Sequence, residues 1–166
     1  MNPIPDHIKK DLRILFIGFN PSIRSSETGH HYANPTNRFW KILYKAGLTE
    51  RKLHPSEDVT LLEQGYGFTN IVSRPTRNAQ EITAEEYRQG REELMEKISF
   101  YRPKIACFVG KGVYHQYSRK RKVAWGEQKN PIVPGTIEFV APSSSGLVRM
   151  PIDEIAAIYQ QMTYLK

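Results

Sequence analysis

The stretch LRILFIGFNPSIRSSETGHHYANPTNRFW, residues 12–40, decides the fold that we expect for this chain. It opens on an apolar run, ILFI at residues 14–17, which is typical of a short strand buried on both faces. Gly18 ends the run, and the bond between Asn20 and Pro21 stops the strand sharply. Ligands of open parallel sheets bind beyond the carboxyl ends of the strands, so Asn20 is placed where such a ligand would lie.

A long polar segment separates this strand from a helix that we expect over residues 38–46. Loops of this length are uncommon in compact domains unless they have a function. The segment carries side chains that suit a flat polar ligand: His30, His31, Tyr32 and Asn34. The alternative is an ordinary strand–turn–helix unit with a long surface loop.

Strands and helical segments alternate along the rest of the chain. Apolar runs predict further strands at residues 68–72, 105–109 and 136–140. Periodicity and capping residues predict helices at residues 59–64, 83–101 and 110–117, and from residue 151 onward. Strands joined through helices form parallel units. We therefore predict an α/β fold, a three-layer α/β/α sandwich around a short, mainly parallel sheet of four or five strands. Residues 1–166 would form a single domain, with residues 1–11 as a polar N-terminal lead-in whose first positions fray.

Composition limits the classes of protein to consider. The chain of 166 residues is 39% hydrophobic and 25% charged, as in an ordinary globular domain. Its net charge of +7 and pI near 9.5 favour a polyanionic partner, first of all nucleic acid. No apolar run approaches the length of a membrane span, and the N-terminus has no apolar signal core. We expect a cytoplasmic protein with no membrane partner, associated with the nucleoid through DNA.

Several familiar kinds of site are missing from the sequence. The single cysteine, Cys107, excludes an internal disulfide and any four-cysteine metal site, and its apolar surroundings indicate a buried packing residue. No dinucleotide-binding glycine motif, phosphate-binding P-loop or Gly-x-Ser-x-Gly elbow is present. His30 and His31 are adjacent and have no carboxylate or thiolate at metal-ligand spacing. We therefore expect no metal and no organic cofactor.

Polar loops follow the predicted strands and would meet at one edge of a parallel sheet. They are rich in amides and hydroxyls and poor in carboxylates, which suits binding of a planar heterocycle and positioning of water. The run PSSSG at residues 142–146 resembles a phosphate-binding loop. Leu147 either enters a base stack as an apolar wedge or packs beneath its own loop. The basic run at residues 118–122 is either a DNA-facing patch or a solvated loop.

Six short motifs occur in order and together resemble the mismatch-specific uracil/thymine-DNA glycosylases, a branch of the uracil-DNA glycosylase superfamily. They are GFNPS at 18–22, GHHY at 29–32, NRFW at 37–40, FTN at 68–70, GK at 110–111 and PSSSG at 142–146. The resemblance covers nearly the whole chain, from residue 12 to the last helix. It implies monofunctional hydrolysis of the N-glycosidic bond of uracil mispaired with guanine, by base flipping, which leaves an abasic site. Thymine and modified cytosines are the further candidate substrates.

The resemblance also implies roles for individual residues. Asn20 would orient the attacking water. The flipped base would be bound by Gly18, Phe19, His31, Tyr32 and Asn70. Double-stranded DNA with a G·U or G·T mismatch would be bound, by a monomer, through Lys111, Ser143, Ser144, Ser145, Gly146, Leu147 and Arg149. Neither a cofactor nor a metal takes part in this chemistry.

The chain mixes features of two branches of that family. GHHY and FTN resemble the thymine-active eukaryotic branch, whereas Gly146 and Leu147 resemble the bacterial one. The more active uracil enzymes of the superfamily carry an aspartate where Asn20 stands. A neutral amide can position water but cannot take a proton from it at pH 7, so we expect a slow enzyme. The alternative function is a low-turnover mismatch-binding or single-strand-binding module on the same fold.

Overall fold

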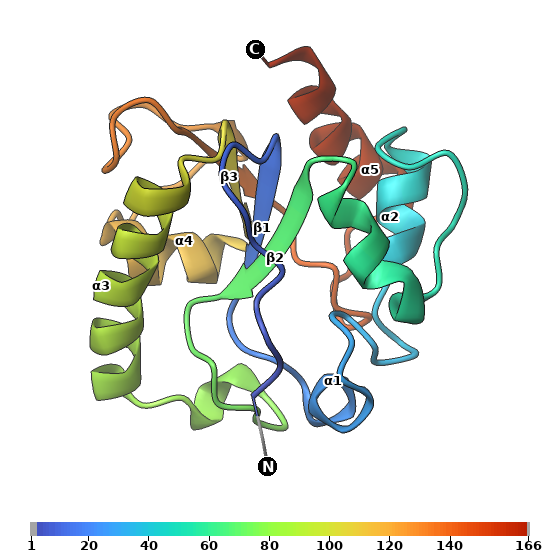
Figure 1. Cartoon of the computed structure of the whole chain (residues 1–166), viewed down its shortest axis with the longest axis horizontal. Coiled ribbons are helices and arrows are strands. Elements are labelled where there is room, and N and C mark those ends of the chain that lie inside the picture. The colour runs from blue at the N-terminus through green and yellow to red at the C-terminus, as the bar shows by residue number, and fades with distance from the viewer. Residues whose placement is uncertain (1–2, 166) are drawn as a thin grey trace.

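The computed structural model describes residues 3–165 and contains one five-stranded sheet (Figure 1). The strands are β1 (Ile14–Gly18), β2 (Tyr66–Asn70), β3 (Ile105–Val109), β4 (Gly126–Glu127) and β5 (Ile137–Ala141). Their order across the sheet is β2-β1-β3-β5-β4. The first four of these are parallel to one another, and β4 pairs antiparallel with β5 at the edge. The predicted mainly parallel sheet is confirmed, and β4 is an addition that the sequence did not reveal.

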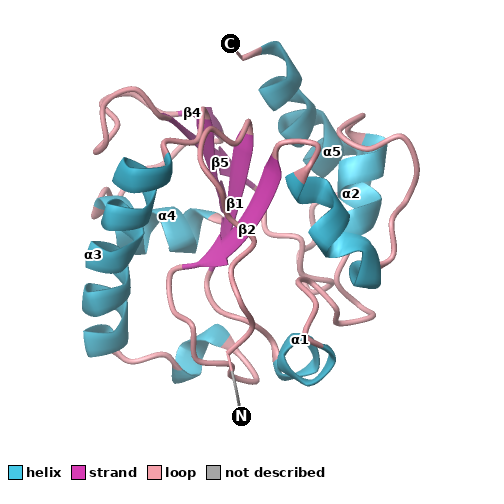
Figure 2. Cartoon of the chain, viewed as in Figure 1, coloured by secondary structure: helices cyan, strands magenta, loops and turns pink. Residues whose placement is uncertain are grey.

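Helices cover both faces of the sheet (Figure 2). The helices α2 (Phe39–Lys45) and α5 (Ile152–Gln160) pack on one face, while α3 (Ala84–Tyr101) and α4 (Lys111–Ser118) pack on the other. Every residue of β1 and β3 is buried, because both strands have neighbours on each side and helices on each face. The predicted three-layer α/β/α sandwich is confirmed.

Shorter helices complete the fold: α1 (Ile23–Thr28), η1 (Pro55–Leu62), η2 (Ala79–Glu81) and η3 (Gln161–Tyr164), the last three of the 3₁₀ type. None of the described helices is long and apolar enough to span a membrane. The helix predicted at residues 59–64 is η1, which begins earlier because His54 and Glu57 form a capping box at its start. The strand predicted at residues 68–72 is β2, which lies two residues earlier in the chain.

The segment after β1 differs from the long loop expected there. Ser22 caps α1, its hydroxyl accepting from the Ser25 N–H at 3.0 Å, and Gly29 ends this helix with a φ of +75°. The six residues of α1 are mainly polar, so no apolar periodicity marked them in the sequence. The long segment is therefore a helix and a turn, held between β1 and α2.

The N-terminal segment before β1 is docked on the edge of the sheet. His7 pairs with Phe68 of β2 through N–H···O bonds of 2.9 and 2.8 Å. Asp6 accepts from the Thr69 hydroxyl at 2.8 Å and from the Lys97 ammonium at 2.6 Å. The segment thus covers the outer edge of the sheet. The predicted fraying of the first positions falls partly on residues 1–2, which lie outside the described part of the chain.

Candidate active site

The carboxyl ends of four parallel strands open into one cavity of about 380 Å³. The chain leaves β1 toward β2 on one side and returns to β3 on the other, so the cavity lies where the strand order reverses, the usual ligand position in such sheets. No described aspartate or glutamate lines it. Eleven predicted site residues do: Gly18, Phe19, Asn20, His31, Tyr32, Asn70, Ser143, Ser144, Ser145, Gly146 and Leu147.

The side chain of Asn20 is held in one orientation. Its Nδ2 donates to the Arg74 carbonyl at 2.7 Å and to the Thr76 hydroxyl at 2.8 Å. Thr76 uses its own proton to donate to the Asn78 carbonyl at 2.7 Å, so its oxygen can only accept from Asn20. Asn20 Oδ1 bonds to none of the described residues. The amide therefore offers the cavity an acceptor and not a donor.

The turn that contains Arg74 and Thr76 is held in place by the Arg74 side chain. The Arg74 guanidinium donates twice to the Glu86 carboxylate, at 2.8 and 3.0 Å, and once to the Glu81 carbonyl at 2.9 Å. The Arg74 hydrogen bond lowers the pKa of Glu86 to about 2, so this pair stays ionised at neutral pH. Sequence reasoning missed the Arg74 and Thr76 contacts, because both join residues more than 50 positions apart.

Close packing brings two further polar groups to the cavity beside Gly18. The sheet register pairs Gly18 with Asn70. A Cβ atom on Gly18 would lie 2.8 Å from Asn70 Oδ1 and 3.2 Å from the Tyr32 hydroxyl. Only glycine at this position leaves room for both side chains. The Asn70 amide forms no hydrogen bond with any described residue, and the Tyr32 hydroxyl is buried without a partner among them. The half-buried Asn70 amide is available to a ligand, whereas the Tyr32 hydroxyl has almost no accessible surface.

Tyr32 and Phe19 are oriented by neighbouring rings. The Tyr32 ring stacks on Phe39 with centroids 3.9 Å apart and an interplanar angle of 9°. Burial raises the pKa of Tyr32 far above its usual value, so its hydroxyl keeps its proton and can donate. The Phe19 ring turns away toward Tyr87 and Gly112. Its backbone N–H donates to none of the described residues.

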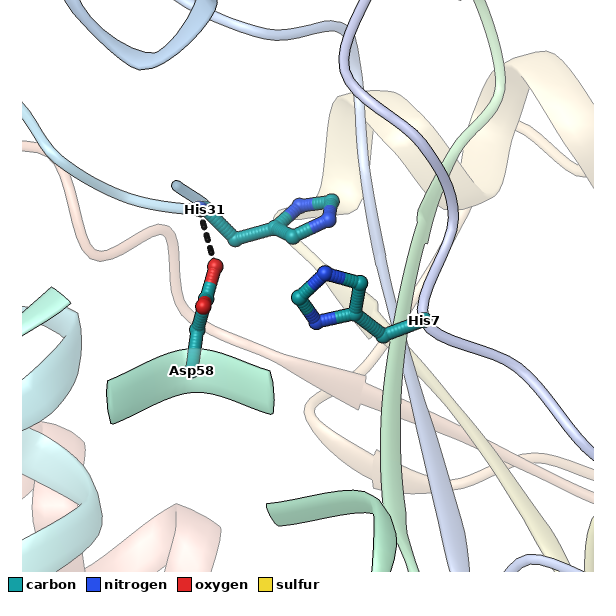
Figure 3. A group of neighbouring side chains, drawn as sticks. All are labelled: His7, His31 and Asp58. Carbon is teal, nitrogen blue, oxygen red and sulfur yellow. Dashed lines mark hydrogen bonds between the residues drawn. The ribbon is translucent and has the colours of Figure 1, made fainter. Parts of the chain in front are cut away.

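His31 is buried beside His7 and Asp58 (Figure 3). Its backbone N–H donates to Asp58 at 2.8 Å, and its Nε2 donates to the Pro5 carbonyl at 3.0 Å. Burial lowers the pKa of His31 to about 4, which keeps the ring neutral. Asp58 also bonds His30 Nδ1 at 3.1 Å. Asp58 of η1 lies 27 positions from His31, so the spacing of residues around the two histidines did not reveal it.

Three of these groups lie close enough to hold a cation. Ligand atoms of His7, His31 and Asp58 are within 4.8 Å of one another (Figure 3). Both Asp58 oxygens and His31 Nε2 bond protein groups, whereas His7 Nδ1 is buried without a partner among the described residues. In this structure the group anchors the loop that carries Tyr32.

The serine loop, residues 142–149 between β5 and α5, is held by hydrogen bonds from Arg38 and exposes one apolar side chain. The Arg38 guanidinium donates to the Val148 carbonyl at 3.1 Å, and its backbone N–H donates to the Ser144 carbonyl at 2.9 Å. A Cβ atom on Gly146 would lie 2.5 Å from the Thr36 carbonyl oxygen. Leu147 is 92% exposed. Of the two alternatives for this leucine, packing beneath its own loop is excluded.

Three basic elements lie outside the cavity. Lys111 is exposed, with its ammonium 4.3 Å from the centroid of the Trp125 ring, at the start of α4 beside the serine loop. Arg149 is exposed at the end of that loop. The basic run at residues 118–122 lies at the other end of α4, about 12 Å along the helix. Within it, Lys120 donates to the Lys129 carbonyl at 2.9 Å, which favours the solvated-loop alternative.

The fold and the cavity together define a class, the α/β proteins with a cavity lined by amides and hydroxyls at the carboxyl ends of parallel strands. Comparison with known proteins defines it further. The family model of the uracil DNA glycosylase superfamily matches residues 5–163, so the chain belongs to that superfamily, whose members act on DNA.

One solved structure shares the fold. It is an NMR structure of a candidate uracil DNA glycosylase from Methanosarcina acetivorans, 22% identical to this chain. The alignment covers 98% of each chain, with a TM-score of 0.59.

Proposed function

We propose that this protein is a monofunctional DNA glycosylase that removes uracil mispaired with guanine and leaves an abasic site. The observation that carries the proposal is the fixed amide of Asn20, whose Oδ1 bonds no described residue and which lines the same cavity as Asn70 and Tyr32. Water held by Oδ1 would be positioned for attack on the sugar carbon once the base is flipped. Thymine and modified cytosines opposite guanine remain the further candidate substrates.

The barrier would fall mainly through support of the departing base. When the glycosidic bond breaks, negative charge develops on the base, and donors aimed at it stabilise the transition state. The free backbone N–H of Phe19 and the Asn70 amide would supply such donors. No described aspartate or glutamate lines the cavity, so it lacks a carboxylate that could act as general base toward the attacking water. We therefore expect slow turnover.

DNA would be held by the exposed groups around the cavity. Lys111, Arg149 and the hydroxyls and backbone N–H groups of the serine loop would contact phosphates. Leu147, exposed beside the cavity, would fill the space that the flipped base leaves. We expect the protein to act on duplex DNA as a monomer in the cytoplasm.

A uracil-containing duplex tests the proposal directly. The protein is incubated in excess with a labelled G·U duplex, and hot alkali then cuts the strand at abasic sites. We expect cleavage at uracil by the native protein, and a rate lower by on the order of 100-fold or more for Asn20→Ala. DNA affinity should change little, because phosphate contacts supply most of it.

The carboxylate-poor cavity favours one second candidate, a DNA-binding module with little turnover. A shifted band in a gel without strand scission after alkali would support that candidate. Cleavage retained within a few-fold by Asn20→Ala would remove Asn20 from the mechanism.

A further inference from the structure

A second cavity of about 450 Å³ lies on the other side of the loop that carries Tyr32. Its walls come from α1, from the start of α2 and from the segment before η1, on the side of the molecule where α1 and α2 lie (Figure 1). Tyr32 lines both this cavity and the candidate active site. The two cavities therefore share one wall.

The charged side chains that line this second cavity are positive. Arg24, Lys41 and Lys52 line it. None of the three forms an ion pair or a side-chain hydrogen bond with any residue that the structure describes. The whole chain has 17 aspartates and glutamates, yet none from the described part lines this cavity. Cations gathered without a counterion create a positive potential that favours an anionic ligand.

The same cavity has aromatic walls. Tyr32 and Trp40 both line it. Trp40 is 4% exposed, and its indole nitrogen is buried with no hydrogen-bond partner among the described residues. This nitrogen has almost no accessible surface, so it is the Tyr32 and Trp40 rings, and not this donor, that the cavity offers to a ligand. Aromatic side chains also offer surfaces on which a nucleobase stacks, whatever its sequence.

We propose that the second cavity is a nucleotide site, with the phosphate bound by Arg24, Lys41 and Lys52 and the attached base placed against Tyr32 and Trp40. Phosphate alone would use the cations only, and a nucleoside alone the aromatic walls only. The ligand has two sources, a free nucleotide or a nucleotide of the bound DNA strand that neighbours the flipped base. The proposal does not rest on glycosylase activity, because its first readout is binding.

Tryptophan fluorescence reports on this site. The chain has two tryptophans, so Trp125→Phe leaves Trp40 as the single fluorophore, at the wall of the cavity. This protein is titrated with thymidine 5′-monophosphate, with thymidine and with inorganic phosphate. We expect the nucleotide to bind at least about tenfold more tightly than either fragment. Inorganic phosphate binding as tightly as the nucleotide would overturn the proposal, leaving a simple anion site.

Charge variants locate the binding. Arg24 and Lys52 are exposed, so Arg24→Ala/Lys52→Ala should fold normally, and we expect it to weaken nucleotide binding by about tenfold or more. Lys104→Ala is the control, because Lys104 is also exposed but lies at the amino end of β3, away from the second cavity. The proposal is refuted if the double variant binds the nucleotide as the native protein does.

Uracil-free single-stranded DNA distinguishes the two sources. If the site holds a neighbouring nucleotide of the strand, the double variant should reduce the slope of log K against log salt by about one unit. If a free nucleotide is the ligand, the slope should stay unchanged while nucleotide binding is lost. Uracil excision by the native protein and by the double variant is measured in parallel. Absence of glycosylase activity in the native protein is then distinguished from failure of the nucleotide site.

Discussion

Removal of the Thr76 hydroxyl should slow uracil excision without weakening DNA binding. Thr76 is buried and accepts one of the two hydrogen bonds that orient Asn20. Thr76→Val keeps the shape of the side chain but removes both the acceptor for Asn20 and the donor to the Asn78 carbonyl. Asn20 then keeps only its bond to the Arg74 carbonyl, and its amide is freer to rotate.

The expected loss of rate follows from the one hydrogen bond that Asn20 loses. A neutral hydrogen bond contributes about 1 kcal/mol net, and about 1.4 kcal/mol corresponds to tenfold in rate. We therefore expect Thr76→Val to lower the single-turnover rate about five- to tenfold, clearly less than the loss expected for Asn20→Ala. The free energy of unfolding loses the contribution of both hydrogen bonds of Thr76, about 2 kcal/mol, which lowers the melting temperature by about 4–8 °C in a domain of this length.

The assay is single-turnover cleavage of a G·U duplex with protein in excess, at a temperature where every variant is folded. Thr76→Ser is the control, because it retains the hydroxyl and should keep the rate within about twofold. A rate for Thr76→Val equal to that of the native protein would refute the argument that this hydroxyl positions Asn20. An equal loss for Thr76→Ser and Thr76→Val would attribute the effect to packing.

Four further predictions concern the cavity and its surroundings. Leu147→Ala should slow cleavage of paired uracil, in G·U and A·U duplexes, more than cleavage of single-stranded uracil, where no vacated space needs filling; equal slowing on all three substrates would contradict the wedge. Lys111→Ala should reduce the salt slope of DNA binding by about one unit, and an unchanged slope would mean that Lys111 faces away from the DNA. Gly18→Ala should lower cleavage by at least about tenfold, because its Cβ would lie 2.8 Å from Asn70 Oδ1, and native rates in this variant would remove Asn70 from base binding. Borohydride should trap no covalent adduct with DNA, since none of the described lysines lines the cavity to form a Schiff base, so adduct in high yield would show lyase chemistry.

Features that depend on neighbouring residues could be predicted from the sequence. The central strands β1 and β3 are continuous apolar runs, and the start of α3 is marked by Thr83 and Glu86, whose reciprocal capping bonds the structure contains. The position of Asn20 followed from a strand that ends at Gly18. Each of these patterns spans only a few residues, so local stereochemistry determines it.

Features that depend on distant contacts could not be predicted. Thr76 is separated from Asn20 by 56 positions, and Asp58 from His31 by 27. Nothing in the residue types of Thr76 or Asp58 marks them, because threonine and aspartate are common on surfaces and in turns. The two-residue strand β4 and the polar helix α1 were missed for a different reason, since neither carries an apolar repeat long enough to be recognised.

The docking of the N-terminal segment has a consequence for the order in which the chain can fold during synthesis. Asp6 leaves the ribosome early, but its partner Lys97 lies 91 positions later. At about 5–20 residues per second, translation separates the two by about 5–18 s. β2 begins at Tyr66, 60 positions after Asp6, so through about the first two thirds of that interval the Pro5 carbonyl, which accepts from His31, has no β2 edge to hold it in place. The loop that carries Tyr32 should therefore reach its final position only after β2 has been made, so that Pro5 and Asp6 take their place long after they are synthesised.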